Sequence, residues 1–305
     1  MAGVVRSLCL ALLLPAMLLA GGCAEPPPEV AELSGPTMGT SYSVKLAPAP
    51  SAQQRAALQQ RIEALLDQVN RQMSTYIADS DLMRFNRSQS VDWLPVPGDL
   101  VELVERARTV SEKTGGAYDV TVGPLVNLWG FGNSGRRDTP PGDAEIGQTL
   151  AQVGYQQLEA RSVPPALRKA VPGLEVDLSS IAKGWAVDRI GQLLEAQGLG
   201  DYLVEIGGDL RVRGSKGPGR PWRVAVERPD EERRAVHQVL ELRDAALATS
   251  GDYRNFFEDG GRRFNHTIDP RSGRAVQHRL ASVSVVAADC TEADAWATAL
   301  MALGD

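Results

Sequence analysis

The sequence predicts an α+β fold in which antiparallel hairpins are covered by helices. Three observations lead to this prediction. A chain of 305 residues with 43% hydrophobic content can bury a substantial core. Strand and helix patterns are mixed along the chain rather than strictly alternating, and glycine-rich turns separate short apolar runs. We therefore expect one large domain or two closely packed lobes.

The charge balance argues against a nucleic-acid surface. The chain has 32 lysine and arginine residues against 38 aspartate and glutamate residues, which gives a net charge of −6. No long basic run interrupts this acidic balance. Nucleic acid is therefore not an expected partner.

The N-terminus predicts export and a lipid anchor. Residues 1–22 combine Arg6, the apolar run "LCLALLLPAMLLA" and small residues, as a secretory signal peptide does. Cys23 follows in the pattern of a bacterial lipobox, so we expect it to carry lipid; ordinary cleavage beside an incidental cysteine is the alternative. Residues 23–33 are predicted to be the lipidated cysteine and a tether, with the folded domain from residue 34.

Cysteine usage excludes stabilisation by disulfides. Cys9 leaves with the signal peptide and Cys23 would carry lipid, so Cys290 is alone in the folded part. It follows the apolar run "SVSVVAA", where a lone cysteine is typically buried or at a strand end. We expect no catalytic role for it.

The first half of the domain predicts a strand and two long helices. "SYSVKLA" alternates apolar and polar residues and is expected to be a strand. Apolar residues then recur with helical spacing from Leu58 to Met73, with Ser51 as the cap. The same spacing in "GDLVELVERARTVSEKTGG" predicts a second helix, ended by Gly115 and Gly116.

The second half predicts a helix and a hairpin. A helix is expected from about Lys183 to Leu194, closed by Gly198, and the strand "DYLVEI" follows. "GSKGPG" is expected to be the turn that joins "DLRVRG" to a returning strand, "PWRVAVE". It lacks the lysine-hydroxyl ending of a phosphate-binding P-loop. Near the end, "RLASVSVVAAD" predicts a buried strand and "TEADAWATALMALG" a helix.

Asp294 and Thr298 are candidate metal ligands in this last helix. They lie four residues apart and so share a helix face, where each offers a hard oxygen. Mg²⁺ takes one or two such ligands and completes its shell with phosphate and water. The alternative is that Asp294 only complements the dipole of its own helix and Thr298 only packs. The spacing by itself favours this alternative.

The stretch "DLSSIAKG" is a candidate phosphate site. Asp177 and Ser180 lie in a loop, and Lys183 lies at a helix N-terminus, where anions are favoured. Alternatively, Ser179 or Ser180 caps the helix while Lys183 is exposed. Composition does not choose between these interpretations.

A dense turn, "FNHTIDPRSGR", supplies the acid-base candidates. His266 and Asp269 are three residues apart and can act as base and orienter, or can help to hold a nucleotide. The other two histidines, His237 and His278, lack such neighbours. His266 is therefore the best acid-base candidate, and a histidine that only stabilises the turn is the alternative.

Seven motifs follow one another along the chain: "GPTMGTSY", "MSTYIADSDLMRFN", "TGGAYDVTVGPLVNLWGFG", "DLSSIAKGWAVDRI", "YLVEIGGDLRVRG", "ATSGDYRNFFEDGGRRFNHTIDPRSG" and "ADAWATALMALG". In their order and spacing, these motifs resemble the ApbE family of FAD:protein FMN transferases. The resemblance covers nearly everything from Gly35 to the end.

The resemblance implies a Mg²⁺-dependent enzyme of the bacterial cell envelope. It would act on the periplasmic side, bind FAD, transfer its FMN half to a threonine hydroxyl of another protein and release AMP. The implied acceptors carry a threonine flavinylation motif and include subunits of membrane redox complexes. The implied architecture is T-fold-like, with antiparallel sheets, packed helices and an FAD cleft between two parts of one domain.

The resemblance also implies roles for individual residues. Lys183, together with His266 or Asp269, would assist catalysis. Positions matching metal ligands are Ser180, Asp294 and Thr298. Positions matching FAD contacts are Met38, Tyr76, Ala117, Tyr118, Asp119, Asp177, Lys183 and Ile268.

Three departures from the family pattern accompany the resemblance. Tyr118 stands where phenylalanine is frequent, and Ala297 stands where some relatives have a further aspartate. Relatives normally continue beyond "LMALGD", so the C-terminal end is expected to be truncated. The rival functions are an FAD-binding periplasmic lipoprotein without transferase activity and an FAD pyrophosphatase that yields FMN and AMP.

Overall fold

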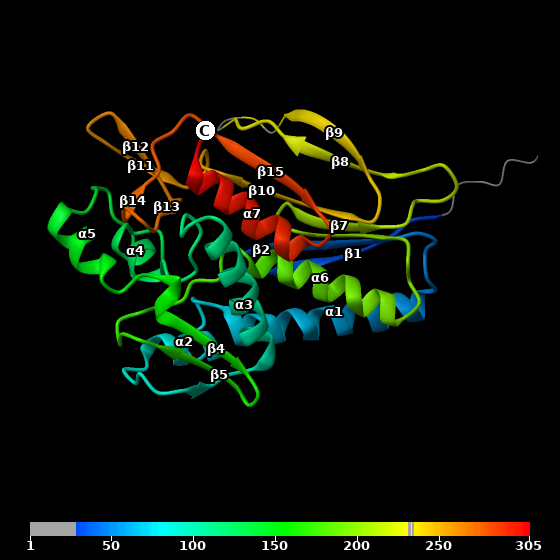
Figure 1. Ribbon diagram of the computed structural model, residues 1–305. Coiled ribbons are helices and arrows are strands. Elements are labelled where there is room, and N and C mark those ends of the chain that lie inside the picture. Colours follow the sequence, from blue (N-terminus) through cyan, green and yellow to red (C-terminus); the bar gives the residue numbers. More distant parts are fainter. Residues whose placement is uncertain (1–28, 231–232, 234) are drawn as a thin grey trace, which may run out of the picture.

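A six-stranded antiparallel sheet forms the centre of the structure, a computed structural model that describes residues 29–230, 233 and 235–305 (Figure 1). The predicted signal peptide and Cys23 lie outside the described residues. The strands, in their order across the sheet, are β1 (Ala31–Thr37), β2 (Thr40–Leu46), β6 (Tyr202–Ile206), β7 (Asp209–Arg213), β10 (Ala245–Gly251) and β15 (Ser282–Ala287).

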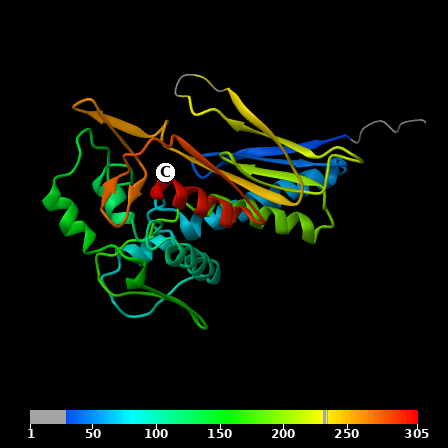
Figure 2. The same cartoon turned by 45° about the horizontal axis from the view of Figure 1, so that its top comes forward.

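Helices cover one face of this sheet (Figures 1 and 2). They are α1 (Ala52–Met73), α6 (Ala182–Ala196) and α7 (Cys290–Leu303), with α3 (Gly98–Lys113) packed against them. The expected strand at "SYSVKLA" is β2, and its alternate residues Tyr42, Val44 and Leu46 are buried as predicted. Ser51 caps α1 by accepting the N–H of Gln54 at 3.3 Å, which confirms the predicted start. None of the helices in the described ranges is long and apolar enough to cross a membrane.

A separate hairpin covers the opposite face of the sheet (Figure 2). It consists of β8 (Trp222–Glu227) and β9 (Val236–Leu242). The prediction that β7 pairs with β8 through "GSKGPG" was therefore wrong. β7 pairs with β6 through the two-residue turn Gly207–Gly208, where both φ angles are positive, and with β10 on its other side. Because both edges of β7 are occupied, β8 finds its partner in β9.

Smaller elements form the remaining part of the molecule, beside and below the helix layer in Figure 1. The rings of Trp129, Phe257 and Phe264 pack together among these elements. Trp129 also donates its Nε1–H to the carbonyl of Gly273 at 2.8 Å. The elements are α2 (Asp81–Arg87), β3 (Leu94–Pro95), α4 (Gly123–Leu128), α5 (Asp143–Leu150), a 3₁₀ turn (Tyr155–Gln157), β4 (Leu158–Ser162), β5 (Pro165–Lys169), β11 (Phe256–Asp259), β12 (Arg262–Asn265), β13 (Ile268–Asp269) and β14 (Arg274–Ala275).

Two sequence predictions about the ends of the domain need correction. The strand expected to be buried is β15, which among the described strands pairs with β10 alone and leaves Val286 53% exposed. Within the described residues it is an edge strand, so one side of it faces solvent. The fold also begins earlier than residue 34, because Ala31 and Leu33 are buried in β1.

Helices α6 and α7 lie close together at Gly184. A Cβ added to this residue would lie 2.7 Å from the carbonyl carbon of Cys290 and 2.9 Å from the Cβ of Asp294. Asp188, one turn further along α6, accepts the backbone N–H groups of Cys290 (3.0 Å) and Thr291 (2.8 Å). The start of α7 is thus fixed to α6, and a glycine at 184 permits the contact.

Replacing Gly184 with alanine should therefore destabilise the protein. The added methyl group must push α7 away, at a cost of about 1–3 kcal/mol in the free energy of unfolding, measured by urea denaturation. Gly147→Ala is the matched control, because Gly147 lies inside α5 with nothing within 4 Å of its added Cβ. That change should stabilise by about 0.5–1 kcal/mol. Equal effects of the two substitutions would contradict the close-packing account.

Candidate active site

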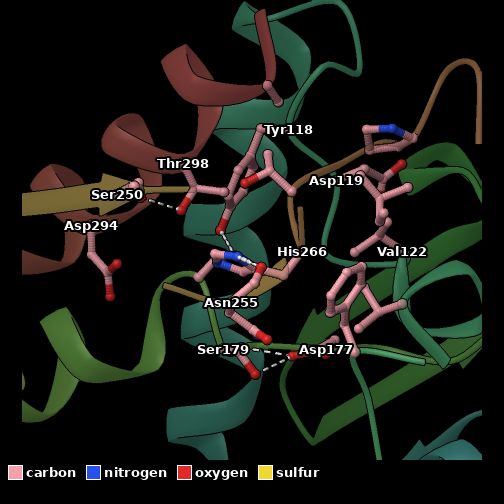
Figure 3. Close-up of a pocket in the computed structure, with 18 of the residues that line it drawn as sticks. Tyr118, Asp119, Val122, Asp177, Ser179, Ser250, Asn255, His266, Asp294 and Thr298 are labelled. Carbon is pink, nitrogen blue, oxygen red and sulfur yellow. Dashed lines mark hydrogen bonds between the residues drawn. The ribbon is translucent and has the colours of Figure 1, made fainter. Parts of the chain in front are cut away.

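A cavity of about 360 Å³ lies where α6, α7 and the end of β10 meet the smaller elements (Figure 3). The family resemblance implied a cleft between two parts of one domain, and this cavity lies in such a position. Most of the residues predicted to form the site line it: Tyr76, Ala117, Tyr118, Asp119, Asp177, Ser180, Lys183, His266, Ile268, Asp294 and Thr298.

The loop before α6 is held by Asp177. Its Oδ1 accepts the backbone N–H of Ser179 at 2.8 Å and the Ser179 hydroxyl at 2.5 Å. No side chain of the loop caps α6, so the idea that Ser179 or Ser180 does so was wrong. The hydroxyl of Ser180 instead donates to Tyr118 Oη at 3.1 Å. Burial, more than any neighbouring charge, raises the pKa of Tyr118 far above its usual value, so Tyr118 stays neutral.

The N-terminus of α6 receives a carboxylate from another helix. Asp294 of α7 accepts the backbone N–H of Gly184 through Oδ2 at 3.0 Å. Its side chain is only 4% exposed, and burial, followed by the charge of Asp209, raises its pKa to about 7. Lys183 and the Gly184 hydrogen bond oppose this rise without cancelling it. Asp294 therefore complements the dipole of α6 rather than that of its own helix, which Asp289 caps.

Lys183 lies beside Asp294 and is ion-paired to Asp209. Burial lowers the pKa of Lys183, but the carboxylates of Asp294 and Asp209 together raise it above its ordinary value. The lysine is therefore a fixed cation, not an exposed side chain. The other oxygen of Asp209 accepts the backbone N–H of Thr249 at 3.2 Å, which ties the pair to β10.

Sequence reasoning missed Asp209. The available signal was its position directly after Gly207 and Gly208, at the start of a short strand whose other face carries Leu210 and Val212. An aspartate that is 1% exposed in such a strand requires a partner. The sequence gives no indication that this partner is Lys183.

Thr298 lies one helical turn beyond Asp294 and faces the same cavity (Figure 3). Its Oγ1 is 3.0 Å from the hydroxyl oxygen of Ser250, at the end of β10. The predicted shared face of Asp294 and Thr298 is therefore present. Ser250 was not predicted, and it positions the threonine hydroxyl.

His266 lies on the other side of the cavity. Its Nδ1 is 3.3 Å from the carbonyl oxygen of Asn255, and its ring meets the ring of Phe131 edge-on at 6.4 Å. Burial lowers the pKa of His266 below its ordinary value of 6.5, only partly offset by the Asn255 carbonyl and by Asp252. With Nδ1–H directed to Asn255, Nε2 is the free base of a neutral ring.

Asp119 lies in the loop between α3 and α4, which forms one wall of the cavity. Its Oδ1 accepts the backbone N–H of Thr121 at 2.8 Å and the Thr121 hydroxyl at 2.7 Å. Its Oδ2 accepts the backbone N–H of Tyr155 at 2.6 Å. Burial raises the pKa of Asp119, and these hydrogen bonds oppose that rise. Both carboxylate oxygens thus hold the loop that carries Ala117 and Tyr118.

Two predicted residues do not line the cavity. Met38 lies in the turn between β1 and β2 with φ = 49° and packs against the main core. The Asp269 carboxylate points into its own turn, where Oδ1 accepts from the backbone N–H (3.0 Å) and Nε (2.9 Å) of Arg271. Because this carboxylate is committed to Arg271, the structure favours His266 over Asp269 as the proton acceptor.

Cys290 is buried at the start of α7, as expected from the sequence. Burial raises the pKa of its thiol well above the usual value, so it stays protonated. It is packed between α6 and α7 and has no place in the chemistry of the cavity.

Comparison with known proteins identifies the family. The model of the ApbE family matches residues 38–305. This chain belongs to the ApbE family. An FAD:protein FMN transferase of Vibrio cholerae is 46% identical over 292 residues, which cover 96% of this chain and 86% of that protein. An FAD:protein FMN transferase of Escherichia coli K12 is 42% identical over 301 residues, which again cover 96% of this chain and 86% of that protein.

Solved ApbE structures share the fold. The flavin transferase ApbE from Vibrio cholerae has a TM-score of 0.83 at 45% identity, covering 92% of this chain and 88% of that one. The flavinyl transferase ApbE of Pseudomonas stutzeri, in its apo form, has a TM-score of 0.82 at 42% identity, covering 91% and 85%. These matches confirm the ApbE architecture predicted from the seven motifs.

The imidazole of His266 should titrate below pH 6.5. Because its folded pKa is lowered, its neutral form is favoured in the native state, and its contribution to stability is lost as the pH falls below 6.5. NMR titration of protein labelled with ¹³C-histidine measures this pKa, and His266→Asn assigns the signal. A His266 signal that titrates above pH 6.5 would contradict the account.

Proposed function

We propose that this chain transfers the FMN moiety of FAD to a threonine hydroxyl of an acceptor protein and releases AMP. The relatives described above are named FAD:protein FMN transferases, which supports FAD as the donor and a protein as the acceptor of FMN. The observation that supports the proposal most strongly is the cavity itself. It places the α6 N-terminus, Lys183 and Asp294 opposite the neutral His266. Phosphoryl transfer needs positive charge at the phosphate oxygens, which Lys183, the α6 amides and a bound divalent cation would supply, and a proton acceptor beside the attacking hydroxyl.

Each residue of the cavity would have a separate role in the transfer. A threonine hydroxyl is a weak nucleophile, so it must lose its proton as its oxygen bonds to the FMN phosphorus. His266 Nε2 would accept that proton. The bond that breaks joins this phosphorus to the bridging oxygen of the pyrophosphate, and AMP leaves with that oxygen. Lys183 and the α6 amides would stabilise the negative charge that grows on the phosphate oxygens.

The donor set fits Mg²⁺ as the metal of this reaction. No group of three histidine, cysteine or acidic side chains that could hold a metal ion exists within the described ranges. Mg²⁺ does not need one, because it is usually held by one or two carboxylates together with substrate phosphates. Asp294 is buried, and burial, followed by the charge of Asp209, raises its pKa, so a cation placed at this carboxylate would be favourable. Asp294, Thr298 and an oxygen of Ser180 would hold Mg²⁺, which would add positive charge at the pyrophosphate.

The remaining cavity residues would bind the two halves of FAD. Tyr76, 72% exposed at the rim, offers an aromatic face, while Ala117, Tyr118 and Ile268 form buried walls. Asp119 would act by fixing its loop rather than by contacting FAD directly. Asp177 would fix the loop before α6 in the same way. A contact between Met38 and FAD stays a prediction.

The sequence supports a location for the reaction. We propose that the chain is exported, lipidated on Cys23 and held on the periplasmic side of a bacterial membrane. Its acceptors would be proteins with a threonine flavinylation motif, such as subunits of membrane redox complexes. An anchored enzyme would meet such membrane-bound acceptors at high local concentration.

Asp294→Asn should abolish transfer. Protein lacking residues 1–23 is incubated with FAD, Mg²⁺ and a purified flavin-accepting domain of a membrane redox complex subunit, and the acceptor is weighed by intact mass spectrometry. Wild type should add one FMN unit. Asp294→Asn should lower the rate at least about 100-fold, because the variant loses the ligand charge at the pyrophosphate, and EDTA should stop the wild type.

Glu292→Gln is the matched control for this experiment. Glu292 is also on α7 but does not line the cavity, so this variant should retain the wild-type rate. If wild type converts FAD to FMN and AMP without labelling the acceptor, the chain is a pyrophosphatase. FAD that survives intact with wild type would instead indicate a binding protein without transferase activity.

A further inference from the structure

A second depression, an open groove, lies beside the cavity. It is lined by Tyr76, by the glycine-rich loop 130–136 and by Asn255. Tyr76, Phe131 and Asn255 line both depressions, so the groove continues into the cavity. The loop is linked to the Tyr76 side of the groove, because Asn133 donates its Nδ2–H to the carbonyl of Thr75 at 2.5 Å.

The junction of the groove and the cavity is at His266. The Asn255 carbonyl contacts His266 Nδ1 at 3.3 Å, and the Phe131 ring meets the imidazole edge-on. Both residues that orient the imidazole are therefore also walls of the groove. A hydroxyl that entered from the groove would therefore pass these two residues on its way to His266.

Arg136 gives this groove its charge. Neighbouring Arg137 is committed to the fold through Glu145 (3.3 Å) and the Leu128 carbonyl (3.2 Å). Arg136 is exposed and has no hydrogen-bond or ion-pair partner in residues 29–230, 233 and 235–305. A free cation at the rim of a groove, on a protein of net charge −6, is complementary to an acidic partner.

We propose that this groove binds an extended segment of the acceptor protein, with an acidic side chain of that segment against Arg136. The segment would lie along loop 130–136 and direct its threonine hydroxyl between Phe131 and Asn255 toward His266 Nε2. Exposed Tyr76 would pack against the segment or against the flavin beside it. This proposal rests on the function proposed above and identifies where its protein substrate binds.

Arg136→Glu tests the proposal through the KM for the acceptor. The probe is the purified flavin-accepting domain used above, in its natural form and in a form whose acidic residues beside the threonine are changed to lysine. At low salt the variant should raise the KM for the natural acceptor about fivefold or more. Its kcat and its KM for FAD should stay within about twofold of wild type. The lysine form should restore part of the lost affinity with Arg136→Glu only.

Arg61→Glu is the control for the change in charge. Arg61 is exposed on α1 and lines neither depression, so this variant should match wild type. An acceptor KM unchanged by Arg136→Glu would overturn the proposal. A raised KM for FAD would assign the groove to FAD and overturn it as well. A wild-type enzyme that labels no acceptor would refute the proposed function itself, a result distinct from either of these.

Discussion

The contact between α6 and α7 at Gly184 is the constraint on which the candidate site depends. Because residue 184 has no side chain, α7 can approach until the Asp294 carboxylate accepts the N–H of Gly184 at 3.0 Å. Asp188 fixes the start of α7 to the same helix. Two segments more than 100 residues apart in sequence thus present one face to the cavity, with Thr298 a turn further along. Any side chain at position 184 would separate the carboxylate from the helix start.

This arrangement leaves one end of the cavity rich in negative charge. Asp209 and Asp294 are both buried, and Lys183 is the cation between them. Burial, followed by the charge of Asp209, raises the pKa of Asp294, and Lys183 opposes this rise without cancelling it. A divalent cation would restore the balance and at the same time bind a pyrophosphate. At the other end, burial keeps His266 neutral, as a proton acceptor must be.

Local patterns predicted the helices well and the long-range pairings poorly. The Ser51 cap, the glycines after α3 and the four-residue spacing of Asp294 and Thr298 are local signals, and the structure bears them out. The partner of β7 depends on which strands compete for its edges, so the turn "GSKGPG" was misleading. The Lys183–Asp209 pair and the α6 cap from Asp294 also join distant segments. The motifs of the ApbE family predicted most of the residues that line the cavity. They did not indicate that the Asp269 carboxylate points away from the cavity, into its own turn.

The most direct test is a crystal structure with FAD and Mn²⁺ in place of Mg²⁺, with the metal located by anomalous scattering. The account predicts a single strong anomalous peak between the Asp294 carboxylate, Thr298 Oγ1 and the pyrophosphate of FAD. It also predicts the FMN phosphorus on the side of the metal that faces His266. A metal bound elsewhere, or a pyrophosphate away from the α6 N-terminus, would contradict the claim that the α6–α7 contact builds the reaction site.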